Sequence, residues 1–375
     1  MVLTLAFRNL FHDRIRLIVT LVGILFSIVL VAVQLGLYLG ARKMIIGMID
    51  NAPAEIWITA YGAKSFEESG TLEGRERHVA LSVPGVASVE PLIAAFNEWR
   101  KPGGGNTLSV VVGTDMREGG LKPWDMVEGS ANDIFRPDAV AVDRTYLENL
   151  GIKAIGDSAQ IDAQRVKVVA LTEGIRSFTT APYVFMPLAR ARAVMGLSGD
   201  QTTFLLVKLA PGADRPTVQK ALAERLPAVE VLTKEVFWQR SLAHWLFETG
   251  AGIALIGGAV LGTLVGTVIV AQTLYSSTKD HLNEFATLRA LGSSAGYIHR
   301  VILLQAALSG AIGYALGMSL ALWIIEASKN SALPIIMTPG LAAGLLALTI
   351  FMCAISALAA IMKVIRIDPA MVFAR

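Results

Sequence analysis

The sequence predicts an α-helical membrane protein with four transmembrane helices, arranged as one plus three, and a large α+β extracytoplasmic domain between the first and the second. Hydrophobic residues make up 54% of the 375 residues and charged residues only 17%, whereas about a quarter of a soluble domain is charged. Residues 44–244 carry 21 basic and 24 acidic side chains, while the remainder carries 12 basic and 6 acidic ones. An acidic insert within an apolar, basic-flanked chain excludes an ordinary cytosolic enzyme, a disordered chain and a nucleic-acid-binding protein.

Four apolar runs are each long enough to cross a bilayer, which takes about 20 residues. The first run is too long for the apolar part of a signal peptide, so we expect an uncleaved anchor. Residues 1–16 place apolar and basic side chains on different helical faces, which predicts an amphipathic helix on the inner membrane surface. The alternative is that the first span simply begins early.

These patterns divide the chain into nine segments. We expect an amphipathic cytoplasmic helix at 1–16, spans at 17–41, 247–276, 298–326 and 339–363, a periplasmic α+β domain at 42–246, a cytoplasmic coupling loop at 277–297, a short periplasmic loop at 327–338 and a cytoplasmic tail at 364–375.

The basic residues near the spans predict their orientation. Nine Lys and Arg residues lie in the short segments on one side, against five near the membrane on the other. Because basic residues are retained in the cytoplasm, we expect a multi-pass inner (cytoplasmic) membrane protein with both termini cytoplasmic and the large domain periplasmic. The spans hold almost no ionisable groups, which argues against an ion-coupled transporter.

The large insert predicts short strands and helices of its own. Pro216 lies in the first turn of a helix expected at 214–226, and Asp214 is its candidate cap. We interpret the insert as a porter-like part that is split by an inserted subdomain near 114–200. Further expected elements are a helix near 71–82 and strands at 108–112, 166–171, 183–186, 203–210 and 229–232.

The sequence predicts no catalytic, cofactor-binding or metal-binding residue, and therefore a non-catalytic subunit. Cys353 is the single cysteine, so no intrachain disulfide can form. The five histidines lack metal-ligand spacing, and the glycines at 103–105 indicate a turn. No Walker-type phosphate loop occurs in the sequence, so any ATP would be bound by a partner.

Two motifs remain as candidate sites. In the loop after the second span, apolar residues recur every three positions and predict a short helix with an apolar stripe that ends at Gly292. Such a stripe binds a partner or the lipid surface, or else packs on its own bundle. In the second span, Gly258, Gly262 and Gly266 form a smooth face for close helix packing, unless they are only the usual glycine content of membrane helices.

The loop sequence EFATLRALG, from Glu284 to Gly292, resembles the cytoplasmic signature of FtsX-like, MacB-type permeases of ABC transporters. The segments FRNL at 7–10, PGV at 84–86 and RIDPA at 366–370 are similar to other parts of the same family. Within the family, residues 274–288 most resemble the DevC type, a permease for glycolipid export.

The resemblance implies one span, a periplasmic domain and three more spans, in a homodimer or pseudo-dimer that works with two separate ABC ATPase subunits. It implies that the loop helix sits in a groove of the ATPase and relays force to the periplasmic domain by mechanotransmission. The implied ATPase-coupling residues are Leu282, Glu284, Phe285, Leu288, Arg289, Ala290, Leu291 and Gly292.

Three functions are compatible with this resemblance. The first is export or extraction of an amphiphile such as a glycolipid or lipid, together with a periplasmic adaptor. The second is release of lipoproteins to a carrier. The third is a regulator that transports nothing and activates a periplasmic cell-wall hydrolase. Membrane lipids are expected partners in each case, and nucleic acid in none.

Overall fold

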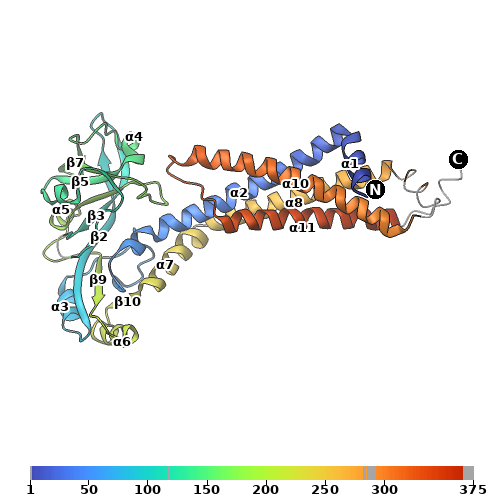
Figure 1. Cartoon of the computed structure of the whole chain (residues 1–375). Coiled ribbons are helices and arrows are strands. Elements are labelled where there is room, and N and C mark those ends of the chain that lie inside the picture. Colours follow the sequence, from blue (N-terminus) through green and yellow to red (C-terminus); the bar gives the residue numbers. More distant parts are fainter. Residues whose placement is uncertain (1, 117–118, 282–283, 285–286, 288–292, 366–375) are drawn as a thin grey trace. The chain divides into compact units, whose positions relative to one another are not determined.

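The computed structural model describes the chain except residues 1, 117–118, 282–283, 285–286, 288–292 and 366–375 (Figure 1). The described residues form two compact units. We call the first the helical bundle, which comprises residues up to 39, 253–329 and from 334 onward. We call the second the head, which comprises residues 40–252 and 330–333.

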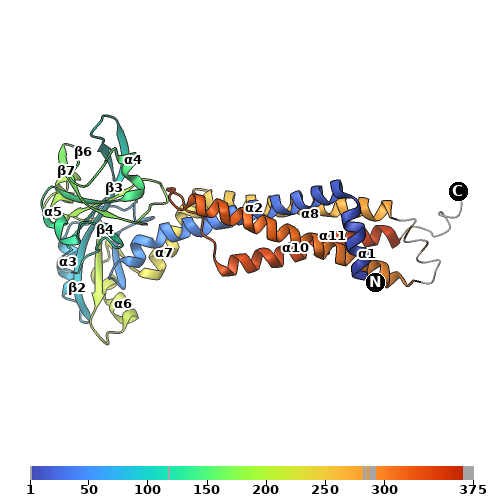
Figure 2. The ribbon, with the colours of Figure 1, turned by 45° about the horizontal axis from the view of Figure 1, so that its top comes forward.

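Long apolar helices build the bundle. The four predicted spans are confirmed as helices long and apolar enough to cross a membrane. The first helix of the chain lies across the end of the bundle, where it packs on α10 (Figure 2). The helices are α1 (Val2–His12), α2 (Arg14–Asn51), α8 (Ala251–Asp280), α10 (Ala295–Ser328) and α11 (Pro339–Ile365).

Two of these helices differ in length from the expected spans. Helix α2 continues to Asn51, so its last turns belong to the head rather than to a membrane-length segment. Helix α8 begins only at Ala251, because Gly250 adopts φ 81° and interrupts the helical path before it.

Glycines let α2 lie close to both α8 and α10. A Cβ at Gly266 of α8 would come 2.4 Å from Ser27 Cβ of α2, and a Cβ at Gly313 of α10 would come 2.6 Å from Ile24 Cγ2. Ser27 Oγ also donates a hydrogen bond of 2.9 Å to the carbonyl oxygen of Gly262. Because lipid offers no hydrophobic force between helices, close contacts of this kind hold α2 in place.

One ten-stranded sheet forms the centre of the head. Its strand order is β10-β1-β9-β2-β3-β8-β5-β7-β4, and β6 pairs with β2 and β7. Most neighbours are antiparallel, whereas β3–β8 and β5–β7 are parallel. The strands are β1 (Ile56–Ala60), β2 (Val86–Arg100), β3 (Asn106–Thr114), β4 (Met126–Glu128), β5 (Ala139–Asp143), β6 (Ser158–Ile161), β7 (Gln164–Thr172), β8 (Tyr183–Pro187), β9 (Phe204–Leu209) and β10 (Val229–Thr233).

The sheet is buried on both faces, as strand β1 illustrates. Ile56 and Ile58 pack with the apolar residues of α3 and α6, whereas Trp57 points to the opposite face. There Trp57 contacts Phe204 and Phe237, with ring centroids 5.6 and 5.1 Å apart. The two faces of the sheet therefore each carry an apolar cluster.

Short helices cover the sheet. The expected cap of α6 is confirmed, because the Asp214 side chain accepts a hydrogen bond from the backbone N–H of Thr217. The five strands expected from the sequence are confirmed as β3, β7, β8, β9 and β10, and the expected helix near 71–82 as α3. The helices of the head are α3 (Arg75–Leu81), η1 (Ala131–Phe135), η2 (Arg144–Tyr146), α4 (Leu147–Leu150), α5 (Leu188–Val194), α6 (Arg215–Arg225), α7 (Lys234–Leu242) and η3 (Ala243–Glu248).

The packing of α8 on α2 predicts opposite effects for two alanine substitutions on one helix. Gly266→Ala places a methyl group against Ser27 and should lower the free energy of unfolding by about 1–3 kcal/mol. Gly257→Ala meets no atom within 4 Å and should leave stability unchanged or raise it by up to about 1 kcal/mol, since alanine favours the helix. Thermal unfolding of the two full-length variants in detergent measures both. Equal stability would contradict the packing of this face.

Candidate functional site

The loop between α8 and α10 holds the predicted coupling residues. Of these, Leu282, Phe285, Leu288, Arg289, Ala290, Leu291 and Gly292 lie outside the described residues. Glu284 is described; it is helical and exposed, and its Oε2 lies 3.1 Å from His281 Nδ1. Ser294 lies at the N-cap of α10 with an extended backbone, but its side chain makes no capping hydrogen bond.

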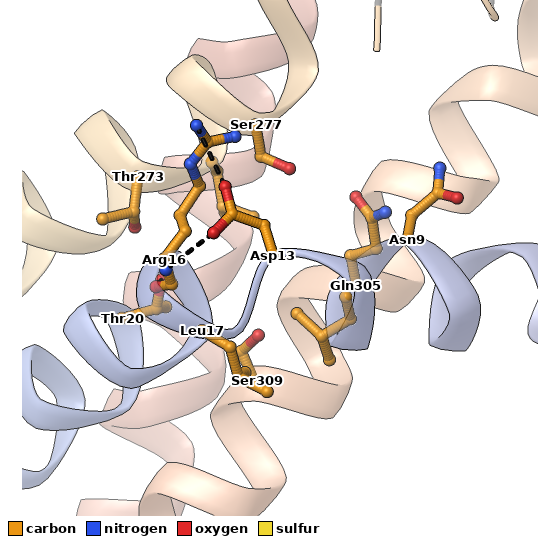
Figure 3. Close-up of a pocket in the computed structure, with 11 residues that line it drawn as sticks. Asn9, Asp13, Arg16, Leu17, Thr20, Thr273, Ser277, Gln305 and Ser309 are labelled. Atoms are coloured by element: carbon orange, nitrogen blue, oxygen red, sulfur yellow. Dashed lines mark hydrogen bonds and ion pairs between the residues drawn. The ribbon is translucent and has the colours of Figure 1, made fainter. Parts of the chain in front are cut away.

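An ion pair joins α2 to the last residue before this loop. Arg16 Nη2 lies 2.5 Å from Asp280 Oδ2 and 3.2 Å from Asp13 Oδ2. Asp13 also caps α2, because its Oδ1 accepts a hydrogen bond of 3.1 Å from the backbone N–H of Arg16. The guanidinium is thus oriented by the carboxylate of the residue that caps its helix (Figure 3), and it reaches across to Asp280 of α8.

Polar side chains line a small pocket beside this ion pair. Asn9 of α1 and Gln305 of α10 point into it, together with Thr273 and Ser277 of α8 (Figure 3). Its volume of about 20 Å³ is room for one water molecule. Among the described residues, the buried atoms Asn9 Nδ2 and Ser309 Oγ have no hydrogen-bond partner. The apolar core of the bundle therefore gives way to polar packing at this end.

An open groove of about 610 Å³ lies on the other side of Arg16. Ile15, Val19 and Ile269 supply its apolar wall, and Gln272 and Ser276 supply polar groups. A second open groove, of about 750 Å³, runs along α1 and α10. The residues that line it are Leu3, Thr4, Phe7, Arg8, Phe11, His12 and Leu308.

The glycine face of the second span lies against α2 of the same chain. A Cβ at Gly258 would meet Gln34 at 2.7 Å, and a Cβ at Gly262 would meet Leu30 at 3.0 Å. Gly266 meets Ser27, as described above. These three glycines therefore pack against α2 within the same subunit.

The head contains a buried carboxylate, Glu67, that binds the segment preceding α8. Glu67 is only 5% exposed. Its oxygens accept hydrogen bonds from the hydroxyls of Tyr183 and Ser65 and from the indole N–H of Trp245. Burial, together with the neighbouring carboxylate of Glu67, raises the pKa of Tyr183 well above its ordinary value, so Tyr183 remains a donor.

Trp245 belongs to η3, a turn of π-helix. This rare geometry often occurs at functional positions. In the same turn, His244 Nδ1 lies 2.8 Å from Glu248 Oε2, and His244 Nε2 lies 3.5 Å from Glu68 Oε2. Trp245 also packs on Phe178, with ring centroids 5.8 Å apart. Buried and partly buried polar groups of the head thus bind the segment that precedes α8.

Neither polar cluster is predicted from the sequence. From the sequence, Arg16 contributes only to the count of basic residues that predicts the orientation. The partners of Arg16 and Trp245 lie far away in the chain, and spacing gives no signal for such pairs. Among the described residues, no group of histidine, cysteine and acidic side chains is arranged to hold a metal ion.

Because Glu67 is buried and accepts several hydrogen bonds, its replacement should destabilise the protein more than replacement of an exposed glutamate. Glu67→Leu leaves the hydroxyl of Tyr183 and the indole N–H of Trp245 without their acceptor and should lower the free energy of unfolding by about 1–3 kcal/mol. Thermal unfolding of the full chain in detergent measures the change. The matched control is Glu224→Leu, which alters an exposed residue of α6 and should have an effect of at most about 0.5 kcal/mol. Equal effects of the two substitutions would rule out a structural role for the cluster.

Two family models match the sequence. A model described as the MacB-like periplasmic core domain matches residues 17–225, which is more than half of the chain. A model described as the FtsX-like permease C-terminal region matches residues 256–369. Together they cover most of both the head and the bundle.

Similar proteins carry related descriptions. The macrolide export ATP-binding/permease protein MacB 2 of Aeromonas hydrophila is 27% identical over 347 residues, which is 85% of this chain and 52% of the relative. This chain therefore spans about half the length of that relative. An uncharacterized ABC transporter permease of Mycobacterium tuberculosis is 25% identical over 384 residues and 98% of each chain.

Solved structures also resemble this chain at low sequence identity. The periplasmic region of MacB from Actinobacillus actinomycetemcomitans is 11% identical, with a TM-score of 0.39, over 51% of this chain and 94% of that one. The extracellular domain of the noncanonical ABC-type transporter YknZ from Gram-positive bacteria is 14% identical, with a TM-score of 0.35, over 48% of this chain and 99% of that one.

Proposed function

Because the chain belongs to the FtsX-like ABC transporter permeases with a MacB-like periplasmic core domain, we propose that it couples ATP hydrolysis on a partner ATPase to a movement of its head. The two family matches are the observation that carries this proposal. The 375 residues contain no Walker-type phosphate loop, which favours ATP binding by the partner. We expect the chain itself to perform no catalysis.

The contact with the ATPase is assigned to the loop between α8 and α10. Leu282, Phe285, Leu288 and Leu291 would fill an apolar groove, while Glu284 and Arg289 would fix the register through charge. The exposure of Glu284 supports this assignment. The orientation that follows places this loop and both termini in the cytoplasm and the head in the periplasm.

Mechanotransmission accounts for the composition of the bundle. Its apolar cores and close helix contacts suit rigid bodies that move, rather than a hydrated path for a solute. The proposed substrate is an amphiphile, such as a lipid or glycolipid, that is extracted or exported with a periplasmic adaptor. The DevC-type likeness of the loop supports this class and stays a prediction.

We also propose that two copies of this chain form the transporter. Helices α2 and α8 each present large apolar side chains that no other described part of the bundle covers. These faces suit contact with lipid and with a second copy. The most exposed of them are Ile15, Ile18 and Val22 on α2 and Ile253, Val260, Leu261, Leu264 and Val268 on α8.

The coupling assignment predicts the loss of the ATPase from a single substitution. Leu288→Asp places a charge in the apolar stripe and should abolish the co-purification of an ATPase bearing Walker motifs from native membranes in mild detergent. The MgATP hydrolysis of the preparation should fall with it. Mass spectrometry of the eluted proteins and a phosphate-release assay measure the two quantities.

Thr287→Asp is the matched control, because it adds the same charge one position away at an exposed residue. It should retain the ATPase. Normal recovery of the ATPase with Leu288→Asp would refute the coupling assignment. An ATPase that remains bound while no amphiphile is moved would instead favour the regulator of a cell-wall hydrolase.

The proposed orientation predicts which cysteines a membrane-impermeant maleimide reaches. The native Cys353 is buried, so it should remain silent. Glu148→Cys in the head should react in intact spheroplasts, whereas Thr4→Cys in α1 should react only after permeabilisation. Labelling of both positions on the same side would overturn the orientation.

A further inference from the structure

We propose that Arg16 is a positioning residue for the loop between α8 and α10, and that its ion pair with Asp280 ties the start of this loop to the first turn of α2. This inference rests on the proposed function, since it says how that loop is held for the partner ATPase. It assigns a role to charges that otherwise only set orientation.

Asp13 orients the Arg16 guanidinium toward Asp280. Asp13 accepts a hydrogen bond from the backbone N–H of Arg16, and its carbonyl oxygen accepts one of 3.0 Å from the N–H of Leu17. Its other carboxylate oxygen lies 3.2 Å from Arg16 Nη2. Because α2 begins at this point, Arg16 projects from a capped helical turn rather than from a free chain end.

Asp280 is an unfavourable residue for its position unless it is paired. It is the last residue of α8, where the carbonyl groups of the helix concentrate partial negative charge. Arg16 supplies the opposing positive charge at 2.5 Å. The Arg16 side chain is 23% exposed and the Asp280 side chain 57% exposed, so water reaches the carboxylate and screens the pair in part.

The contacts continue from this pair into the loop. His281 follows Asp280 directly, and its Nδ1 lies 3.1 Å from Glu284 Oε2. The side chain of Glu284 is thereby connected to α2 through Asp280 and His281. A force on the loop would reach α2 by this route as well as along α8.

The surroundings allow the pair to move without opening an apolar core. Thr273 and Ser277 lie beside Arg16, and Asn9 and Gln305 face the same pocket (Figure 3). Polar groups of this kind can exchange hydrogen-bond partners with one another or with water as α2 and α8 shift. The pair therefore lies at a polar end of the bundle.

The test compares Arg16→Asp, Asp280→Arg and the double variant that exchanges the two charges. The exchange places an arginine at the end of α8, where it suits the helix dipole and faces both Asp13 and the carboxylate introduced at position 16. Arg14→Asp is the control, because it makes the same charge change at an exposed residue two positions away.

The first readout is amide hydrogen exchange of residues 281–294 in the full chain in nanodiscs, without ATPase. Each single variant should speed exchange there by about fivefold, and the exchanged pair and Arg14→Asp should not. Unchanged exchange in the single variants, or no rescue by the exchanged pair, would overturn the proposal.

The second readout is MgATP hydrolysis by the native complex. The single variants should retain the co-purified ATPase but lose hydrolysis by about threefold or more, and the exchanged pair should recover it. Full hydrolysis in a single variant whose loop exchanges faster would refute a role of Arg16 in coupling. If wild-type chain recovers no ATPase, the proposed function fails, whereas hydrogen exchange still decides whether Arg16 positions the loop.

Discussion

Close packing of α2 against α8 and α10 is the constraint on which the bundle depends. At Gly266 and Gly313, a single added methyl group would overlap a side chain of α2. An apolar side chain gains nothing from burial when lipid is the alternative, so tight contact and the hydrogen bond from Ser27 to the Gly262 carbonyl supply the attraction. The outward faces of α2 and α8 are free of this requirement and carry large branched residues instead.

The two polar clusters join chain segments through directional interactions, an ion pair at Arg16 and hydrogen bonds at Glu67, in addition to apolar packing. Ridges and grooves set the crossing angle of two helices, whereas an ion pair or a hydrogen-bonded carboxylate also fixes which residues face each other. Arg16 does this at one end of the bundle, and Glu67 does it within the head. In both places one partner lies at or near an end of α8, since Trp245 precedes its first residue, Ala251, and Asp280 is its last residue.

Local signals allowed much of the fold to be predicted from the sequence. Asp214 and Pro216 marked the start of α6 because capping needs only neighbouring residues. Hydropathy found the four spans for a similar reason, although it could not foresee the continuation of α2 or the turn at Gly250. The Glu67 cluster joins residues 65, 67, 183 and 245, and Arg16 meets a residue 264 positions away, so no spacing rule predicts either.

The pairing of β1 has a consequence for biogenesis. Its two neighbours in the sheet are β9 and β10, which leave the ribosome about 150 and about 170 residues later, or about 8–35 s at ordinary rates of translation. Until then, a strand with Trp57 and two isoleucines at its centre has no partner on either edge. The nascent protein must therefore protect this segment from aggregation, whereas β5 to β8 meet their partners over much shorter stretches of sequence.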